Sequence, residues 1–195
     1  MDGTLFPLTR AGIQQAIDNL PSTGGLIIIS QPFTLDATTL TVGSNGTGDP
    51  TTGKSVMLWF ANTGVCARTA NPMVIVAGRS AIVGLGRSTY LRNIGSSGAR
   101  VVDIAHGAEH VIIRDISLLG KGPAIKAQGS TPGGRWSNLF LESSSGSTIE
   151  TQVLNDTFQA EGIFISHVSA TGSCWRNGVT GTGGSLEWGQ SNATV

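Results

Sequence analysis

A pattern of short apolar runs recurs along the chain, and this recurrence limits the folds that the sequence can adopt. In the clearest copy, HVIIRDISLLG at 110–120, two alternating runs flank Arg114 and Asp115 and a glycine closes the second run. The copies begin at intervals of roughly 25 to 30 residues. They are LIIISQPFTL from 26, SVMLWFANTG from 55, SAIVGLGRST from 80, HVIIRDISLL from 110, WSNLFLESSS from 136 and GIFISHVSAT from 162. One repeat is too short to bury its own apolar face, so we expect the repeats to stack around a continuous core.

The repeats favour strands over helices. Each contains short β-branched runs separated by polar or glycine turns, and none has a long window with helical spacing. A β-sandwich is the alternative, because strands also recur at the shorter spacing typical of sandwiches. The longer period favours a parallel β-helix. We therefore predict an all-β fold in which residues 24–195 form a single-stranded parallel β-helix of about six to seven coils.

One helix is expected before the first repeat, within an N-terminal segment of residues 1–23. In LTRAGIQQAIDNLP, which begins at Leu8, four apolar residues share one helix face: Ile13, Ala16, Ile17 and Leu20. Thr9 is a suitable N-cap, and Pro21 lies just past the predicted end. A stack of coils exposes apolar core and an open strand edge at its end, so we expect this amphipathic helix to cap it.

Composition excludes several kinds of partner. Charged residues make up only 12% of the chain and the formal net charge is zero, so we expect no nucleic-acid partner. No apolar run approaches the roughly 18 residues that cross a membrane, so no membrane insertion is expected. The first residues, MDGTLFPLTR, lack a basic segment followed by an apolar one, and we expect no secretory leader. The acids and histidines of DIAHGAEH at 103–110 match no zinc spacing, and neither a metal nor a cofactor is predicted.

Three stretches resemble one family. AGIQQAIDNLPSTGGLIIIS, SAIVGLGRSTYLRN and HVIIRDISLLG look like the capping helix and coils of the pectate-lyase-like superfamily, above all its bacteriophage tail-spike and tail-fibre versions. The resemblance covers most of residues 9–172. It implies a right-handed β-helix that is typically a homotrimer. It does not imply one activity, because this scaffold carries lyases, hydrolases, epimerases and non-catalytic fibres.

Candidate catalytic residues follow from aligning the coils on their apolar pairs. We align Val111 and Ile113 with the pair Leu139 and Leu141, and both with Ile163 and Ile165, and we expect all six side chains to point inward. The next positions then lie at one turn, one strand spacing of about 4.8 Å apart.

This alignment predicts that Asp115, Glu142 and His167 cluster along one edge within roughly 10 Å. Polysaccharide cleavage needs a carboxylic acid and a carboxylate, or a base and a cation, and Arg114 could supply the cation. The alternative is that these charges are ordinary solvated turn residues.

The outward positions between the inward pairs are also apolar. They are Met57, Ile112, Phe140 and Phe164. A solvated sheet face would carry polar residues there, so we expect a cover, either from other subunits or from the loops 44–54 and 129–136. Trp136 and Trp175 are candidate platforms for stacking sugars, although tryptophan also fills interfaces and loop bases.

Two functions remain open from the sequence. The first is a structural or receptor-binding component of a virus particle, such as a tail spike, tail fibre or capsid-surface protein. We expect such a component to be homotrimeric, bound to other virion proteins and able to contact host polysaccharide. The second is a polysaccharide lyase or glycoside hydrolase, in which case a secreted or cell-surface bacterial protein is the alternative to a virion protein.

Overall fold

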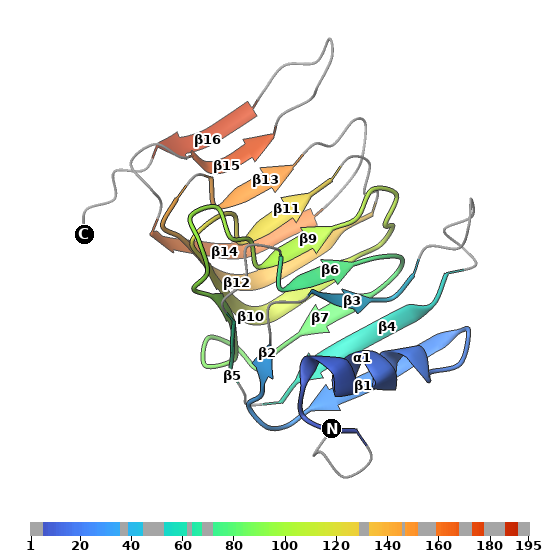
Figure 1. Ribbon diagram of the computed structural model, residues 1–195. Coiled ribbons are helices and arrows are strands. Elements are labelled where there is room, and N and C mark those ends of the chain that lie inside the picture. The colour runs from blue at the N-terminus through green and yellow to red at the C-terminus, as the bar shows by residue number, and fades with distance from the viewer. Residues whose placement is uncertain are drawn as a thin grey trace.

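The computed structural model describes residues 6–35, 39–44, 53–61, 64–67, 72–128, 133–145, 147–151, 159–167, 173–177 and 186–190. In this part of the chain one α-helix precedes a parallel β-solenoid (Figure 1). The elements are α1 (Arg10–Asp18), β1 (Gly24–Ile29), β2 (Thr34–Leu35), β3 (Leu40–Val42), β4 (Ser55–Phe60), β5 (Gly64–Ala67), β6 (Val74–Val76), β7 (Ala81–Val83), β8 (Tyr90–Asn93), β9 (Val102–Ile104), β10 (Ile112–Gly120), β11 (Ile125–Ala127), β12 (Arg135–Ser143), β13 (Ile149–Thr151), β14 (Gln159–His167), β15 (Ser173–Asn177) and β16 (Leu186–Gln190).

Two sheets run along the solenoid. In the first sheet β1, β4, β7, β10, β12 and β14 pair in parallel, and β2, β5 and β8 form a second row that joins the later half of β10. In the second sheet the order is β3, β6, β9, β11, β13, β15 and β16, with β16 antiparallel. Apart from β16, each strand therefore pairs with the equivalent strand one coil away, which is the arrangement that the recurring apolar runs predicted.

The solenoid has about four turns. The six to seven coils expected from the sequence are therefore too many. The handedness of the solenoid stays a prediction.

The core is a set of inward columns in which each apolar side chain stacks on the next coil. One column contains Leu91, Leu118, Leu141 and Ile165, which are consecutive partners in the strand register. The first three are completely buried, and Ile165 at the end of the column is half-buried. Stacked aliphatic side chains of this kind supply most of the free energy of folding in a solenoid.

A corner divides each long strand of the first sheet. Asp115, Asn138 and Gly162 occupy this corner in successive coils, and all three have a positive φ, of 56°, 51° and 60°. Asn, Asp and Gly tolerate this left-handed conformation best. We call these three residues the corner row.

The corner changes the register that the sequence predicted. The extra residue at Asp115 shifts the alternation, so Ile116 and Leu118 are the partners of Leu139 and Leu141, whereas Ile113 pairs with Trp136. Alignment on Val111 and Ile113 was therefore wrong, although both side chains are buried. The partners of Leu139 and Leu141 in the next coil are Ile163 and Ile165, as predicted.

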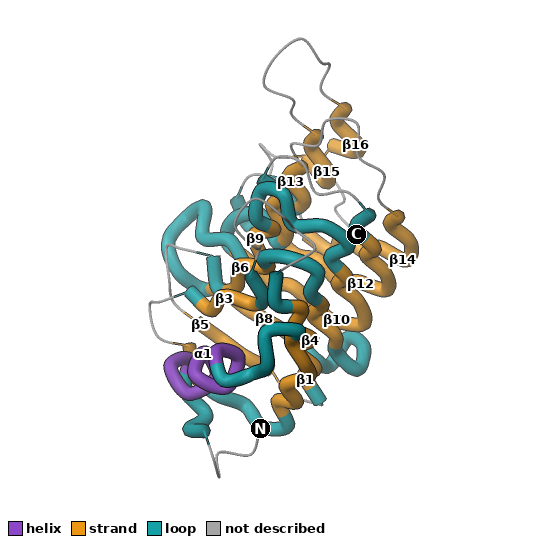
Figure 2. Tube along the Cα trace, turned by 90° about the vertical axis from the view of Figure 1, so that its right-hand side faces the viewer, coloured by secondary structure: helices purple, strands orange, loops and turns teal. Residues whose placement is uncertain are grey.

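Helix α1 packs across the first coil (Figure 2). Thr9 is its N-cap and accepts a hydrogen bond from the Gly12 N–H, as the sequence predicted. Ile13 and Ile17 are buried in the core. At the other end, Lys54 Nζ donates to the carbonyl oxygens of Ile17 and Asp18, where a cation stabilises a helix C-terminus.

No helix among the described residues is long and apolar enough to cross a membrane.

Candidate functional site

The structure does not bring the predicted catalytic residues into one row. Asp115 lies at the corner, opposite Asn138, and its Oδ1 accepts a hydrogen bond of 2.8 Å from Asn138 Nδ2. Arg114 Nε lies 3.9 Å from Asp115 Oδ2, and both side chains are substantially exposed. The cluster of Asp115 with Glu142 and His167 is therefore a wrong prediction, and its cause is the extra corner residue.

Glu142 and His167 are partners in the register of β12 and β14, next to a bulge that follows Leu141. Their row along the outer surface continues to Leu119 and Arg92 in the preceding coils. Glu142 is half-buried, and the side chain of His167 lies outside the described part of the chain. Two of the four predicted catalytic residues are thus neighbours along one edge.

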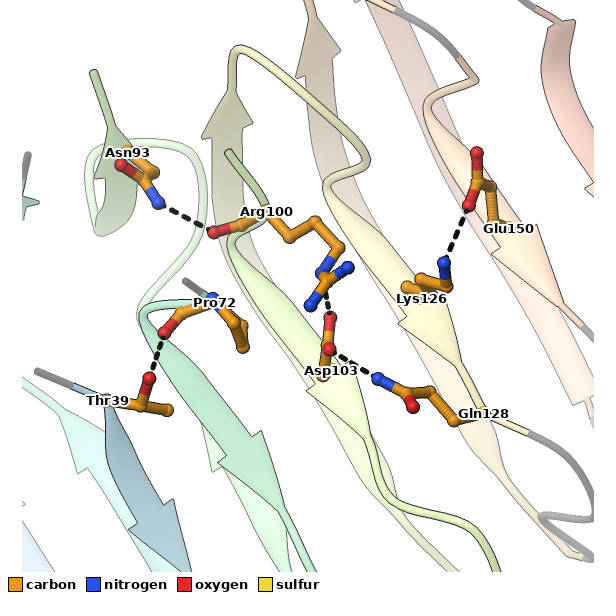
Figure 3. Close-up of polar contacts among 8 residues, drawn as sticks. All are labelled: Thr39, Pro72, Asn93, Arg100, Asp103, Lys126, Gln128 and Glu150. Carbon is orange, nitrogen blue, oxygen red and sulfur yellow. Dashed lines mark hydrogen bonds and ion pairs between the residues drawn. The ribbon is translucent and has the colours of Figure 1, made fainter. Parts of the chain in front are cut away.

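A second polar row lies on the face of the second sheet that points away from the core, and the sequence analysis missed it (Figure 3). The middle residues of β9, β11 and β13 are Asp103, Lys126 and Glu150, which are consecutive partners in the register. The register continues from Glu150 to Arg176 and from Arg176 to Glu187 on β16. The sign of the charge alternates along Asp103, Lys126 and Glu150, which we call the charged ladder; the side chains of Arg176 and Glu187 lie outside the described part of the chain.

Asp103 is the most enclosed member of the charged ladder, with a side chain only 2% exposed. Arg100 Nε lies 2.9 Å from Asp103 Oδ1, and Gln128 Nε2 donates a hydrogen bond of 2.6 Å to Asp103 Oδ2. Asn93 supports this arrangement, because its Nδ2 donates to the carbonyl oxygen of Arg100 and its Oδ1 accepts from the Gly95 N–H. The carboxylate is therefore held from its own turn and from the next coil.

Burial raises the pKa of the Asp103 carboxyl above its ordinary value of 3.8. Arg100, the hydrogen bond from Gln128 and the charge of Lys126 each act to lower this pKa, but desolvation has the larger effect. A raised pKa is typical of catalytic acids as well as of buried structural pairs. A catalytic acid must also reach its substrate, and the low exposure of Asp103 favours a structural role.

Lys126 and Glu150 form the next contact of the charged ladder, at 3.5 Å between Lys126 Nζ and Glu150 Oε2. Both side chains are about one-quarter exposed. Opposite charges on neighbouring strands stabilise a sheet, so the charged ladder joins successive coils on the outside as the apolar columns join them on the inside. Its sequence signal is one charged residue in the middle of each short apolar piece: VDI, IKA and IET.

The outer surface of the first sheet is apolar over its first coils. We call this surface the apolar wall, and its exposed or half-buried residues are Leu26, Ile28, Met57, Trp59 and Ile112, whereas Ala81 and Val83 in the same rows are buried. Leu26, Ile28 and Met57 are 49%, 38% and 39% exposed. Met57 and Ile112 belong to one row of this wall, with Ala81 between them.

Phe140 and Phe164 lie in a different row, beyond the corner. Their rings stack with centroids 5.0 Å apart, and the guanidinium of Arg87 lies 4.5 Å from the centroid of Phe140. Arg87 therefore covers Phe140 from a turn, while Phe164 stays 53% exposed. The single outward stripe that we predicted is two separate surfaces, because the register shifts at the corner.

The two tryptophans have different outcomes. Trp136 is only 2% exposed and packs in the core beside Ile113, so it cannot present its ring to a sugar. The prediction that Trp136 is a sugar platform was wrong. Trp175 pairs in the register with Ile149, and its side chain lies outside the described residues.

Among the described residues, no three His, Cys, Asp or Glu side chains gather into a possible metal site. Glu109, from the acid- and histidine-rich stretch, pairs instead with Arg79 at 3.1 Å.

A scan against protein-family models and searches of curated proteins and solved structures found no match. The strand register establishes the parallel β-solenoid, whereas the resemblance to the pectate-lyase-like superfamily stays a prediction from sequence motifs.

Proposed function

We propose that this protein is a non-catalytic, structural or receptor-binding component of a virus particle, such as a tail spike, tail fibre or capsid-surface protein. In this proposal the solenoid is a right-handed β-helix related to the pectate-lyase-like superfamily. Right-handed crossovers are strongly preferred between parallel strands of one sheet. The protein acts in the virion, where it joins other virion proteins and offers its surface to host polysaccharide.

The observation that carries this proposal is the apolar wall. Leu26 and Met57 are register partners on adjacent strands, and Ile28 and Trp59 are partners in the next row. Exposed apolar side chains that adjoin one another, as those of Leu26, Ile28 and Met57 do, mark an interaction site, because isolated exposed apolar residues are common but contiguous patches are not. We propose that three copies of the chain pack their walls against one another around a threefold axis parallel to their solenoid axes, as a homotrimer.

The charged ladder supports a structural role over a catalytic one. Asp103 is enclosed by Arg100 and Gln128, and Glu150 is paired with Lys126. These carboxylates are engaged in contacts between coils, whereas a hydrolase needs a pair of carboxyl groups that both reach one bond of the substrate.

Light scattering tests the proposal on the intact chain. We expect a mass of three chains for the wild type and a single chain for Met57→Glu, because a charge in the wall opposes its burial. Leu85→Glu is the matched control, since Leu85 is an exposed apolar residue on a turn, outside the wall. A wild-type protein that stays monomeric at all concentrations would contradict the trimer.

The alternative function is a polysaccharide lyase or glycoside hydrolase, and the register pairing of Glu142 with His167 favours it. Incubation with a panel of acidic and neutral polysaccharides, followed by assays for unsaturated and reducing ends, separates the two functions. Product that disappears in Glu142→Gln but persists in the exposed-residue control Glu161→Gln would establish the enzyme and exclude the non-catalytic proposal.

A further inference from the structure

The two sheets of the solenoid end at different levels. Beyond β15, the second sheet continues with the antiparallel strand β16. The first sheet, among the described residues, ends at β14, which pairs with β12 on one side only. The β15–β16 hairpin extends past β14 at this end of the molecule (Figure 2). At this end of the solenoid the second sheet is therefore longer than the first sheet by one strand.

The side chains of β14 are less covered than their partners on β12. Leu139 and Leu141 are completely buried, whereas their register partners Ile163 and Ile165 are half-buried. Phe164 stacks one face of its ring on Phe140 but remains 53% exposed. Both the inward column and the outward aromatic pair thus lack a further neighbour in the described part of the chain.

We propose that β14 is a docking edge that accepts one extended strand from a partner protein. The strand would hydrogen-bond to the open side of β14, bury apolar side chains on Ile163 and Ile165, and place an aromatic or aliphatic side chain on Phe164. Strand addition to an open sheet edge is a common mode of peptide recognition, in which the main chain gives affinity and alternate side chains give specificity.

Two features favour a single strand over a second solenoid as the occupant. Helix α1 covers the opposite end of the stack, so head-to-tail stacking of two copies is blocked. The β15–β16 hairpin blocks a second copy that approaches end-on, because it occupies the level that the next coil would need. A single strand paired with the open side of β14 would leave the pairing of β14 with β12 and of β15 with β16 unchanged.

Charge further defines the partner strand. Glu161 is exposed on β14, and its partner on β12 is the uncharged Ser137. A Lys or Arg opposite Glu161 on the open side would form a cross-strand ion pair. The partner that we infer is therefore an extended segment with a basic residue followed by alternating apolar residues.

A synthetic peptide with the sequence of Arg135–Ser143, RWSNLFLES, is the probe, because β12 pairs with β14 in parallel and we expect the peptide to take the same register on the open side. We expect the fluorescently labelled peptide to bind the full chain. A version with Ser137→Lys should bind roughly twofold to fivefold more tightly, because it adds the ion pair with Glu161. A permuted peptide of the same composition should not bind.

Two variants of the protein assign the binding to β14. Phe164→Glu should weaken binding by about fivefold or more through loss of the cross-strand aromatic contact. Leu85→Glu is the matched control, since Leu85 is also 53% exposed, and it should bind like the wild type. Equal binding by the two variants would overturn the proposal.

Hydrogen exchange provides a readout that needs no variant. The amides of Ile163 and Ile165 should exchange quickly in the free protein and slow down when the peptide is added. Amides that are already protected in the free protein would show that the edge is covered, and the proposal would then be wrong. This readout is independent of the mass measurement that tests the trimer, so either proposal can fail alone.

Discussion

Truncating Leu118 to Ala should destabilise the protein more than the same truncation at Leu141. Both side chains are completely buried in one inward column, but their neighbours differ. Leu118 lies between Leu91 and Leu141, which are also completely buried. Leu141 lies between Leu118 and the half-buried Ile165.

The expected free energies follow from a transfer contribution and a cavity contribution. Losing the outer part of a buried leucine costs roughly 0.8 kcal/mol per methylene, or about 2.4 kcal/mol in all. The cavity adds about 24 cal/mol per Å³ that the surroundings fail to fill. Around Leu118 the stacked coils cannot collapse, so we expect about 4 to 5 kcal/mol. Beside Leu141 the end of the column can relax, and we expect about 3 kcal/mol.

Urea denaturation followed by circular dichroism measures both values, provided that the two variants unfold with the same dependence on urea concentration. Ile163→Val, at the half-buried end of the neighbouring column, is the control and should cost less than about 1 kcal/mol. A larger cost for Leu141 than for Leu118, or a cost at Leu118 below about 1.5 kcal/mol, would show that the inward columns do not stack in this register.

Three further changes test the charged ladder, the corner row and the helix end. Because burial raises the pKa of Asp103, its contribution to stability is full below the ordinary carboxyl pKa and is lost as the pH rises through the raised value. The wild type should therefore gain stability relative to Asp103→Asn as the pH falls. Urea midpoints of both proteins across a pH series measure this difference, and parallel pH profiles would contradict the raised pKa of Asp103. Asn138→Ala should lower the free energy of unfolding in urea by about 1 to 2 kcal/mol, and Asn138→Gly should lower it less. Both variants lose the hydrogen bond to Asp115, but only alanine is strained by the positive φ at this position. Lys54→Ala should cost about 0.5 to 1 kcal/mol by removing the cation from the C-terminus of α1, and an unchanged melting temperature would refute that role.

The sequence predicted best what depends on residues close together in the chain. Thr9 and the face that contains Ile13 and Ile17 define α1 without any long-range information. The inward alternation of Leu139 with Leu141, and its match to Ile163 with Ile165, follows from the period of a strand.

The predicted register was wrong beyond the corner, where the chain bends within a strand. A residue in the left-handed conformation adds one position, so strict alternation from Val111 gives the wrong partners after Asp115. A signal for the corner is present in the sequence. Asp115, Asn138 and Gly162 each stand directly before an apolar pair in successive coils, and these are the residue types that adopt a positive φ.

The enclosure of Asp103 could not be predicted from local sequence. Its partners come from a turn, through Arg100, and from the next coil, through Gln128. Their contact depends on how the coils align, and the sequence repeat did not specify that alignment. The prediction for Trp136 was wrong for the same reason, because its ring points into the core only in the register that includes the extra corner residue.

The alternation of sign along the charged ladder has a consequence for how the coils assemble. Successive coils of a solenoid are similar enough that a strand can pair with the next coil but one and leave the intervening coil looped out. Such an error would place Asp103 against Glu150, and like charges directly opposite each other destabilise a sheet. Correct stacking restores Lys126 between them. The charged ladder thus makes the pairing that skips a coil energetically unfavourable. The aliphatic columns of the core do not discriminate against that pairing, because their side chains are nearly interchangeable.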